Sequence, residues 1–259
     1  MIRVGVAGAN GKMGKEVVNM VLQNPDFELV LAIDKYTADK KISDIQITSD
    51  FSDIKKINPN IMVDFTQPST IFENIKIYQE NKIKSVIGTT GLSSEEISKI
   101  KSMSKENSTG IVIAPNFSIG AILMMQFSKT ASKYFSNAEI IEFHHNQKHD
   151  APSGTSIKTA QLMMEENDNF KLGNCEETEI IEGSRGGEFL ENEKGKIQIH
   201  SVRMPGFVAS QEVIFGSDGQ TLKIRHDTIN RTCYMSGVAL AINYLYKNNE
   251  FIYGLENIL

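Results

Sequence analysis

The stretch Val6-Ala7-Gly8-Ala9-Asn10-Gly11-Lys12-Met13-Gly14 decides the fold of this 259-residue chain. It follows an apolar run at residues 2–7 and opens an amphipathic segment, which predicts a first strand, a tight turn and a first helix. At such a turn, dinucleotide-binding folds place backbone N–H groups against a pyrophosphate. Asn10 stands at the middle site, where glycine is usual, and asparagine tolerates the left-handed backbone angles of a tight turn. A glycine-rich turn without a ligand is the alternative interpretation.

The rest of the first half alternates short apolar runs with amphipathic stretches. We predict strands from these runs at residues 2–7, 28–33, 61–65, 84–87 and 111–114. Strands that alternate with helices indicate βαβ units and a parallel sheet. Ser93, followed three residues later by Glu96, forms a capping box and predicts the start of one intervening helix.

The pattern changes after Pro115. A long helix is predicted over residues 118–135, then a strand over 138–145, a loop over 146–153 and a helix over 230–247. Between them, β-rich runs at 196–203, 207–215 and 220–226 are separated by Pro205-Gly206 and Asp218-Gly219, which are strong turn signals and give this segment hairpin character. The sequence therefore predicts an α/β nucleotide-type domain followed by an α+β domain with a mixed or antiparallel sheet.

The composition of the chain excludes some classes of partner and location. The 27 Lys and Arg against 32 Asp and Glu give a net charge of −5, which disfavours nucleic acid as a partner. Because no apolar run approaches roughly 18 residues and the start lacks a signal-peptide layout, we expect no membrane span and a cytoplasmic protein. Cys175 and Cys233 lie far apart without metal-ligand spacing, so both are predicted to be reduced thiols and no metal site is expected.

Asp34 strengthens the dinucleotide interpretation. It ends the second predicted strand, 20 residues after Gly14, where a carboxylate accepts hydrogen bonds from ribose hydroxyls, which favours NADH. The neighbouring Lys35 is a cation placed to meet a 2′-phosphate, so NADPH is expected to bind as well, although a solvated surface lysine is the alternative. Loops at residues 64–69 and 88–91 follow predicted strands and are expected to line the nicotinamide half of the site.

Three of the five histidines fall in His144-His145-Asn146-Gln147-Lys148-His149-Asp150. Adjacent strand residues point to opposite faces, so a bend is needed before His144 and His145 can both serve one ligand. Histidine suits proton exchange near neutrality, and lysine stabilises negative charge or donates a proton. Ser153-Gly154-Thr155 then opens a helix whose first turn is suited to a carboxylate or phosphate, with simple capping as the alternative.

Together these residues identify a resemblance to the dihydrodipicolinate reductase (4-hydroxy-tetrahydrodipicolinate reductase) family of bacterial lysine and diaminopimelate synthesis. It spans essentially the whole chain. Its carriers are the glycine turn at 6–14, Asp64-Phe65-Thr66, Gly88-Thr89-Thr90-Gly91, Ala114-Pro115-Asn116-Phe117-Ser118, Glu142-Phe143-His144-His145 with Lys148, Asp150-Ala151-Pro152-Ser153-Gly154-Thr155, Ile199-His200-Ser201-Val202-Arg203 and Arg231.

The resemblance implies a reductase that transfers a hydride from NADH or NADPH to a cyclic dicarboxylic imine. It implies a Rossmann-type dinucleotide-binding domain at 1–116, a domain for substrate binding and tetramerisation at 117–229, a C-terminal helix at 230–259 that returns to the first domain, and a homotetramer.

The resemblance also assigns roles to residues. It implies that His144 is a proton donor and acceptor, that Lys148 is a proton donor, and that His145, Gly154 and Thr155 hold the substrate carboxylates. The cofactor residues that it implies are Gly8, Ala9, Asn10, Gly11, Lys12, Met13, Asp34, Lys35, Gly88, Thr89, Thr90, Ala114, Pro115, Asn116 and Phe117.

Some positions depart from the family pattern. Gln67 and Lys35 stand where some members carry arginine, which weakens the case for a strong NADPH preference, and Ser210 stands where many members carry histidine. Three alternatives stay open: an amino-acid or semialdehyde dehydrogenase of similar fold, a non-catalytic NAD(H)-sensing protein, and a reaction in which Lys148 forms a Schiff base.

Overall fold

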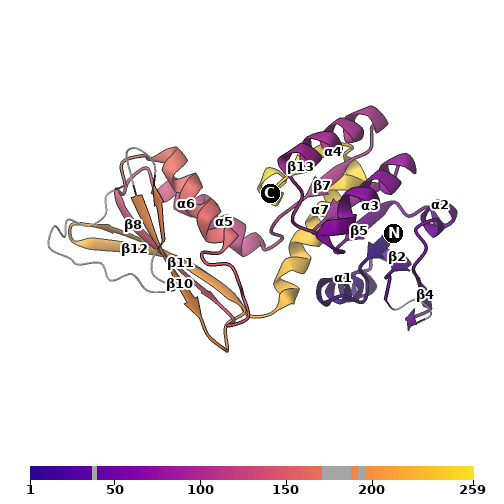
Figure 1. Ribbon diagram of the computed structural model, residues 1–259, viewed down its shortest axis with the longest axis horizontal. Helices are drawn as coiled ribbons and strands as arrows, with labels where there is room; N and C mark the ends of the chain where they lie inside the picture. Colours follow the sequence, from indigo (N-terminus) through magenta and orange to yellow (C-terminus); the bar gives the residue numbers. More distant parts are fainter. Residues whose placement is uncertain (37–39, 171–187, 192–195) are drawn as a thin grey trace. The chain divides into compact units, whose positions relative to one another are not determined.

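The computed structural model describes residues 1–36, 40–170, 188–191 and 196–259, with 188–191 described by their backbone alone. It divides into two compact units (Figure 1). The first unit comprises Met1–Ile119 and Arg231–Leu259, and the second comprises Gly120–Asn230. Each unit has its own sheet and its own apolar core.

The first unit contains a Rossmann-type sheet with the strand order β13-β7-β6-β5-β1-β2-β4-β3. All of its pairs are parallel except β3 with β4, so the predicted parallel sheet is confirmed. The strands are β1 (Ile2–Ala7), β2 (Phe27–Ile33), β3 (Lys41–Ile42), β4 (Ile45–Thr48), β5 (Ile61–Asp64), β6 (Lys84–Ile87), β7 (Ile111–Ile113) and β13 (Phe251–Tyr253). The chain runs outward from β1 in both directions, so the strand order reverses between β1 and β5, where open sheets bind ligands.

Helices cover both faces of this sheet (Figure 1). On one face lie α1 (Lys12–Gln23) and α7 (Met235–Lys247); on the other lie α2 (Asp53–Ile57), α3 (Pro68–Glu80) and α4 (Ser94–Asn107). The predicted capping box of α4 is confirmed, since the Ser93 hydroxyl accepts from the Glu96 N–H and the Glu96 carboxylate accepts from the Ser93 N–H.

Helix α7 brings the end of the chain back to the first sheet. The Lys84 ammonium on β6 donates to the carbonyl of Leu245 at 2.6 Å, which satisfies an acceptor at the helix C-terminus. At the other end, a Cβ on Gly237 would lie 2.1 Å from the carbonyl oxygen of Phe117, so only glycine permits this approach. The helix begins at Met235, after a 3-10 turn at Arg231–Tyr234, and therefore later than the predicted residue 230.

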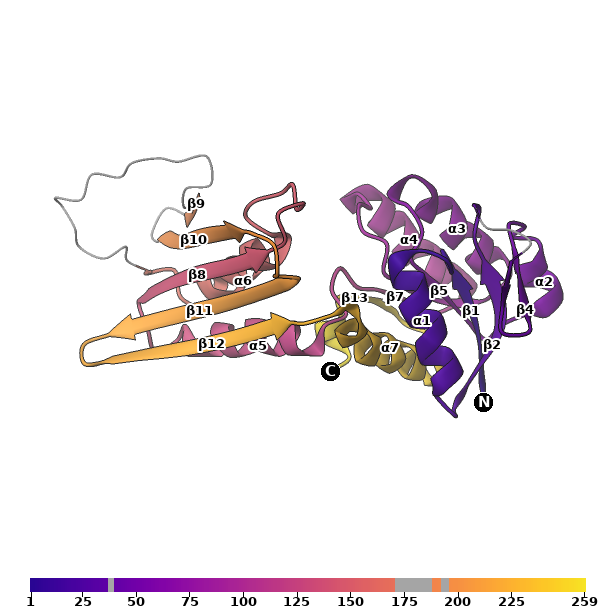
Figure 2. The same cartoon turned by 90° about the horizontal axis from the view of Figure 1, so that it is seen from below.

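The second unit has a mixed sheet with the strand order β12-β11-β8-β10-β9. Its strands are β8 (Asn137–His144), β9 (Glu188–Glu191), β10 (Lys196–Arg203), β11 (Ala209–Ser217) and β12 (Gln220–Thr228). Helices α5 (Ile119–Ala131) and α6 (Gly154–Glu166) pack on one face of it (Figure 2). The predicted α+β domain is confirmed, and β10 beside β8 is its parallel pair.

Two predictions for this unit need correction. The turn at Asp218-Gly219 joins β11 to β12 as a hairpin, but β10 and β11 do not pair across Pro205-Gly206, because both flank β8. The helix predicted to reach residue 135 ends at Ala131. The Asn167 amide donates to the carbonyls of Ser132 and Phe135, which holds the following turn out of the helix.

Two further sequence predictions concern membranes and cysteines. Within the described residues, every helix is too short or too polar to cross a bilayer. Cys233 lies as a partly buried thiol in the 3-10 turn before α7, and Cys175 lies outside the described residues.

Candidate active site

The turn between β1 and α1 is shaped as a cradle for a phosphate group. Gly8 has φ +75°, and a Cβ there would lie 2.4 Å from the carbonyl oxygen of Phe65. A Cβ on Gly14 would lie 1.9 Å from the carbonyl oxygen of Gly8, so the helix approaches the strand only with glycine at this position. Gly11 caps α1 without a side-chain hydrogen bond, which leaves first-turn N–H groups for an anion. These residues fit a dinucleotide.

Asp34 lies directly after β2 and faces the same turn. Its carboxylate accepts from the N–H of Asn10 and from the N–H of Tyr36, both at 3.0 Å. Because a carboxylate offers about four lone-pair positions, further acceptor capacity remains for ribose hydroxyls. Lys35 is exposed, with its ammonium 6.0 Å from the centre of the Tyr36 ring.

The loops after β5, β6 and β7 meet around Phe65. A Cβ on Gly88 would lie 2.0 Å from the Phe65 ring, and the rings of Phe65 and Phe117 lie 5.8 Å apart. The N–H of Ala114 donates to the carbonyl of Ile87, which joins the ends of β6 and β7. The predicted cofactor residues of the first unit are therefore gathered at the carboxyl ends of its parallel strands.

Asp64 supports these loops from below. This fully buried carboxylate accepts from the hydroxyls of Thr66 and Tyr78, both at 2.6 Å, and from the amide of Asn74 at 3.0 Å. The Thr89 hydroxyl also donates to it, at 3.3 Å. Burial raises the pKa of Asp64, against hydrogen bonds that lower it. The carboxyl group thus holds the 64–69 and 88–91 loops in place.

In the second unit, the helix-covered face of the sheet changes from apolar to polar along β8. Ala138 and Ile140 belong to the apolar core, whereas Glu142 and His144 continue the same row with ionisable side chains. The neighbouring strands change at the same level, since Ser201 on β10 and Gln211 on β11 both stand opposite Glu142. The loop that contains His145, Lys148 and Asp150 begins at this polar end of the face.

Glu142 is the fully buried centre of this polar end. Its carboxylate accepts from both terminal nitrogens of Arg203, at 2.6 and 2.8 Å, and from the N–H of Ser153 at 3.2 Å. It also contacts Nδ1 of His144, the last residue of β8. Burial raises the pKa of Glu142, but the hydrogen bonds with His144, Arg203 and Ser201 outweigh it and lower this pKa to about 2.

Lys148 and His145 lie in the loop that follows. The Lys148 ammonium donates to both oxygens of Asp150, at 2.6 and 2.7 Å, while an Arg203 nitrogen donates to the backbone carbonyl of Asp150. Nδ1 of His145 is buried and has no hydrogen-bond partner among the described residues. His149 is exposed. Strand β8 ends at His144, which allows the bend that the adjacent histidines require.

Helix α6 begins at Gly154, directly beside this loop, as the sequence predicts. Ser153 is its N-cap, and its hydroxyl accepts from the N–H of Ser156. The Ser156 hydroxyl donates to the amide oxygen of Gln211, and the amide nitrogen of Gln211 donates to the Thr159 hydroxyl. This buried network fixes the first turn of α6, with Gly154 and Thr155, on the sheet.

Sequence reasoning assigned no role to Asp64, Glu142 or Arg203, although it quoted all three within motifs. The signal for Glu142 is its spacing: in a strand, residue 142 shares a face with 140 and 144, so a carboxylate is placed between the core and a histidine. The signal for Arg203 is weaker, because only the register of β10 against β8 brings it opposite His144.

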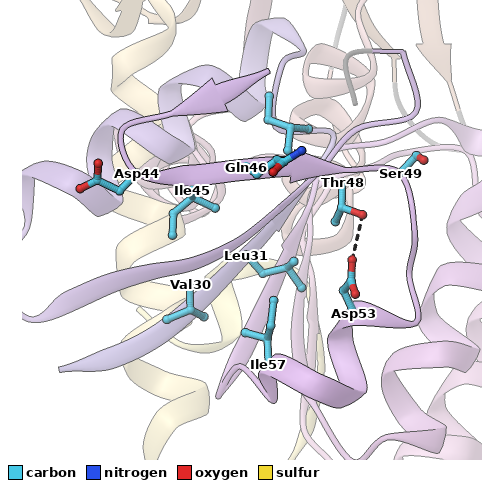
Figure 3. Close-up of a pocket in the computed structure, with 10 residues that line it drawn as sticks. Val30, Leu31, Asp44, Ile45, Gln46, Thr48, Ser49, Asp53 and Ile57 are labelled. Carbon is cyan, nitrogen blue, oxygen red and sulfur yellow. Dashed lines mark hydrogen bonds between the residues drawn. The ribbon is translucent and has the colours of Figure 1, made fainter. Parts of the chain in front are cut away.

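A metal-binding cluster or a cavity can mark a site independently of the sequence motifs. Among the described residues, no group of three or more His, Cys, Asp or Glu side chains is arranged to hold a metal ion. A cavity of about 520 Å³ lies between β4 and α2, lined by Val30, Ile45 and Ile57 and by the hydrogen-bonded pair of Thr48 and Asp53 (Figure 3). It includes no residue that the sequence assigned to the site.

Comparison with known proteins covers the whole chain. Residues 2–117 match the family model described as dihydrodipicolinate reductase, N-terminus, and residues 120–259 match dihydrodipicolinate reductase, C-terminus. The 4-hydroxy-tetrahydrodipicolinate reductase of Listeria innocua is 47% identical, over 100% of both chains. That of Streptococcus pneumoniae serotype 19F is 46% identical, over 100% of this chain and 99% of the relative.

Solved structures with a similar fold include a member of the same family. A dipicolinate-bound dihydrodipicolinate reductase from Paenisporosarcina sp. TG-14 is 41% identical, with a TM-score of 0.89 over 100% of both chains. An amine dehydrogenase from Mycobacterium smegmatis has a TM-score of 0.68 at 10% identity, over 100% of this chain and 96% of that one, and this likeness shows the fold alone.

Proposed function

This chain belongs to the dihydrodipicolinate reductase family, and from this premise we propose which of its residues perform the reaction. The enzyme reduces 4-hydroxy-tetrahydrodipicolinate to tetrahydrodipicolinate with NADH or NADPH and a proton, and the 4-hydroxyl group leaves as water, in lysine and diaminopimelate biosynthesis. The bound reduced nicotinamide supplies the hydride, while the protein binds, orients and exchanges protons.

The cofactor is held by the first unit. The turn from Gly8 to Met13 lies against its pyrophosphate, with the N–H groups of Lys12 and Met13 at the start of α1 as donors, and Asp34 binds the adenosine ribose with Lys35 beside it. The nicotinamide half is held by two segments, Gly88 to Thr90 and residues 114–117. The buried Asp64 fixes the first of them through its hydrogen bond with Thr89. The close backbone approaches at Gly8 and Gly14 favour this assignment.

The substrate is held by the second unit. Its two carboxylates require cations and N–H donors, which Lys148, His145 and the N–H groups of Gly154 and Thr155 provide. His144 donates and accepts a proton, and Lys148 donates a proton to the reduced ring. One observation carries this proposal. The Glu142 carboxylate contacts the His144 ring and also accepts from the N–H of Ser153, so it places His144 beside the start of α6.

Steady-state kinetics on four single variants tests these roles. Lys148→Ala and His144→Ala are expected to lower kcat by at least ~10²-fold, the usual loss for an acid–base group. His145→Ala removes a carboxylate contact and is expected to raise KM more than it lowers kcat. His149→Ala is the control from the same loop, and its kcat/KM is expected to change less than about threefold. Near-normal kcat in Lys148→Ala would overturn the assignment.

The assembly is proposed to be a homotetramer. No described helix covers the second face of the mixed sheet, which carries the partly buried side chains of Ile141, Phe143, Val202 and Ile214. Apolar side chains on an uncovered sheet face favour association with a second copy of the chain. Sedimentation equilibrium is expected to give four chains per particle, and Ile214→Glu to give fewer; a monomer at micromolar concentration would refute the tetramer.

The cellular location is proposed to be the cytoplasm, where NADH and NADPH are regenerated. Cell fractionation is expected to recover the enzyme with cytoplasmic markers, and recovery outside the cell would contradict this.

A further inference from the structure

The Glu142 carboxylate joins two parts of the site that the reaction uses separately. On one side it contacts Nδ1 of His144, and on the other it accepts the N–H of Ser153, the N-cap of α6. The guanidinium of Arg203 forms a bidentate ion pair with Glu142 and also donates to the carbonyl of Asp150 at 2.7 Å. Strand β8, strand β10 and the start of α6 therefore converge on one buried carboxylate, and Arg203 links the loop at Asp150 to it.

The charge of Glu142 determines what the contact with His144 means. Because the pKa of Glu142 is lowered to about 2, the group is an anion at the pH of the reaction. A carboxylate anion only accepts hydrogen bonds, so Nδ1 of His144 must carry the proton of this contact. Nε2 is then the ring nitrogen left to exchange a proton, as when a carboxylate orients a catalytic histidine.

The same anion is held rigidly enough to position its partners. Glu142 is fully buried, and the Arg203 side chain is only 6% exposed, so neither group rearranges through water. Ser201 on β10 and Gln211 on β11 stand opposite Glu142 and pin its backbone within the sheet. A displacement of this carboxylate would move both the His144 ring and the start of α6.

We propose that Glu142, clamped by Arg203, is the positioning residue of this active site, which fixes the tautomer of His144 and holds the substrate-binding start of α6 in register with it. This inference rests on the proposed role of His144 in proton exchange. It gives the fully buried Glu142 a role in the reaction that acts through His144 and the start of α6.

The proposal has a consequence for pH dependence. The charged groups around His144 are Glu142 on its own strand, Arg203 on β10, and Lys148 and Asp150 in the following loop, while β11 presents the uncharged Ala209 opposite it. Glu142→Gln removes the anion and leaves the cation of Arg203, which disfavours the protonated ring. The pH profile of kcat/KM is therefore expected to shift toward lower pH in Glu142→Gln.

The central test compares Glu142→Gln with Glu139→Gln. Glu139 lies on the same strand but on the uncovered face, where it is exposed and pairs with Nε2 of His200 at 2.8 Å, so Glu139→Gln removes a similar pair away from the polar end of the helix-covered face. Sedimentation checks that this variant keeps the assembly of the unaltered protein, because Glu139 stands opposite Ile214 on the face proposed to associate. Glu142→Gln is expected to lower kcat at least roughly tenfold and to shift the profile. Glu139→Gln is expected to keep kcat within about twofold, with an unchanged profile. Equal behaviour of the two variants would overturn the proposal.

A second variant separates positioning from folding. Glu142→Gln leaves Arg203 buried without its anion, which destabilises the fold, whereas the double variant Glu142→Gln with Arg203→Gln removes both charges. The double variant is expected to regain melting temperature while kcat stays at least about tenfold low. Recovery of kcat together with melting temperature would show that Glu142 acts on stability alone and would refute the positioning role.

Two readouts keep the inference distinct from the proposed function. Nitrogen NMR of the histidine rings in the unaltered protein, with His144→Ala for assignment, is expected to show the proton of neutral His144 on Nδ1; a proton on Nε2 would contradict the inference without any Glu142 variant. If His144→Ala retains activity, the proposed role of His144 fails. If it loses activity while Glu142→Gln does not, only the inference fails.

Discussion

Asp34 is the residue that we expect to govern the choice between NADH and NADPH. Two backbone N–H groups already hold its carboxylate at the end of β2, which orients it toward the glycine turn, and the exposed Lys35 stands next to it. A carboxylate favours the ribose diol of NADH, and a lysine attracts the 2′-phosphate of NADPH. We expect turnover with both cofactors, with NADH at least comparable.

The corresponding variant is Asp34→Ala, which is expected to reduce kcat/KM for NADH more than for NADPH, because only the diol loses its acceptor. Parallel steady-state assays with the two cofactors measure this difference. A preference of the unaltered enzyme for NADPH by more than about a hundredfold, equivalent to roughly 2.7 kcal/mol, would contradict the assignment.

We expect Glu142 to make the folded protein sensitive to acid. Its pKa is about 2 in the folded state and near 4.3 in an unfolded chain. A lowered pKa stabilises the fold above the unfolded value, and this contribution is lost as pH falls from about 4 through 2. The difference corresponds to roughly 3 kcal/mol.

Urea unfolding at pH 7 and pH 3 tests this contribution. Between these values the unaltered protein is expected to lose more free energy of unfolding than Glu142→Gln, by a part of that amount. The sign follows because the glutamine variant has no carboxylate to protonate at this position. The same pH dependence in both proteins would show that Glu142 contributes nothing to acid sensitivity.

The sequence indicates which residues belong to the candidate site, and the structure shows which of them contact one another. The glycine turn and Asp34 could be predicted because their spacing along one βαβ unit is local. Arg203 could not be connected to Glu142, since the two are 61 residues apart and meet only through the register of β10 on β8. Asp64 was predicted to lie in a loop that lines the ligand site, yet its carboxylate accepts hydrogen bonds from Tyr78 and Asn74 within the protein.

At the scale of elements, the approach of α1 to β1 depends on Gly14. A Cβ there would lie 1.9 Å from the carbonyl oxygen of Gly8, so Gly14→Ala must push the helix away from the turn that is proposed to bind the pyrophosphate. We expect a loss of roughly 1–3 kcal/mol of stability and weaker NADH binding. Thermal unfolding and fluorescence titration with NADH measure the two effects.

Gly216→Ala is the matched control, since a Cβ at this β11 position meets no atom within 4 Å. It is expected to bind NADH as the unaltered protein does and to change stability by less than about 1 kcal/mol. If Gly14→Ala binds NADH with unaltered affinity, the close approach of helix and strand is not what forms the cofactor site.

The elements that could be predicted are those with a strong local pattern. The parallel strands β1, β2, β5, β6 and β7 were located to within a residue because each is a short apolar run between helices. The segment of β3, β4 and α2 and the edge strand β13 were not predicted, because these short elements are mostly exposed or partly buried and carry no continuous buried apolar run. The early end of α5 was missed because it depends on Asn167, more than thirty residues away.

At the scale of the molecule, the chain leaves the first unit near Ile119 and returns to it at Arg231. The residues proposed for the cofactor lie in the first unit, and those proposed for the substrate lie in the second. We therefore expect the activity to require both units. No local pattern in the sequence indicates the return of α7, which depends on contacts such as that of Lys84 with Leu245.

The most direct test of the central claim is an absorbance assay of nicotinamide oxidation by the purified enzyme. Freshly generated product of dihydrodipicolinate synthase is the substrate, and NADH or NADPH is the reductant. We predict a loss of reduced-nicotinamide absorbance with each cofactor that requires both enzyme and substrate. No loss with either cofactor, from an enzyme that binds NADH and is folded, would contradict the account.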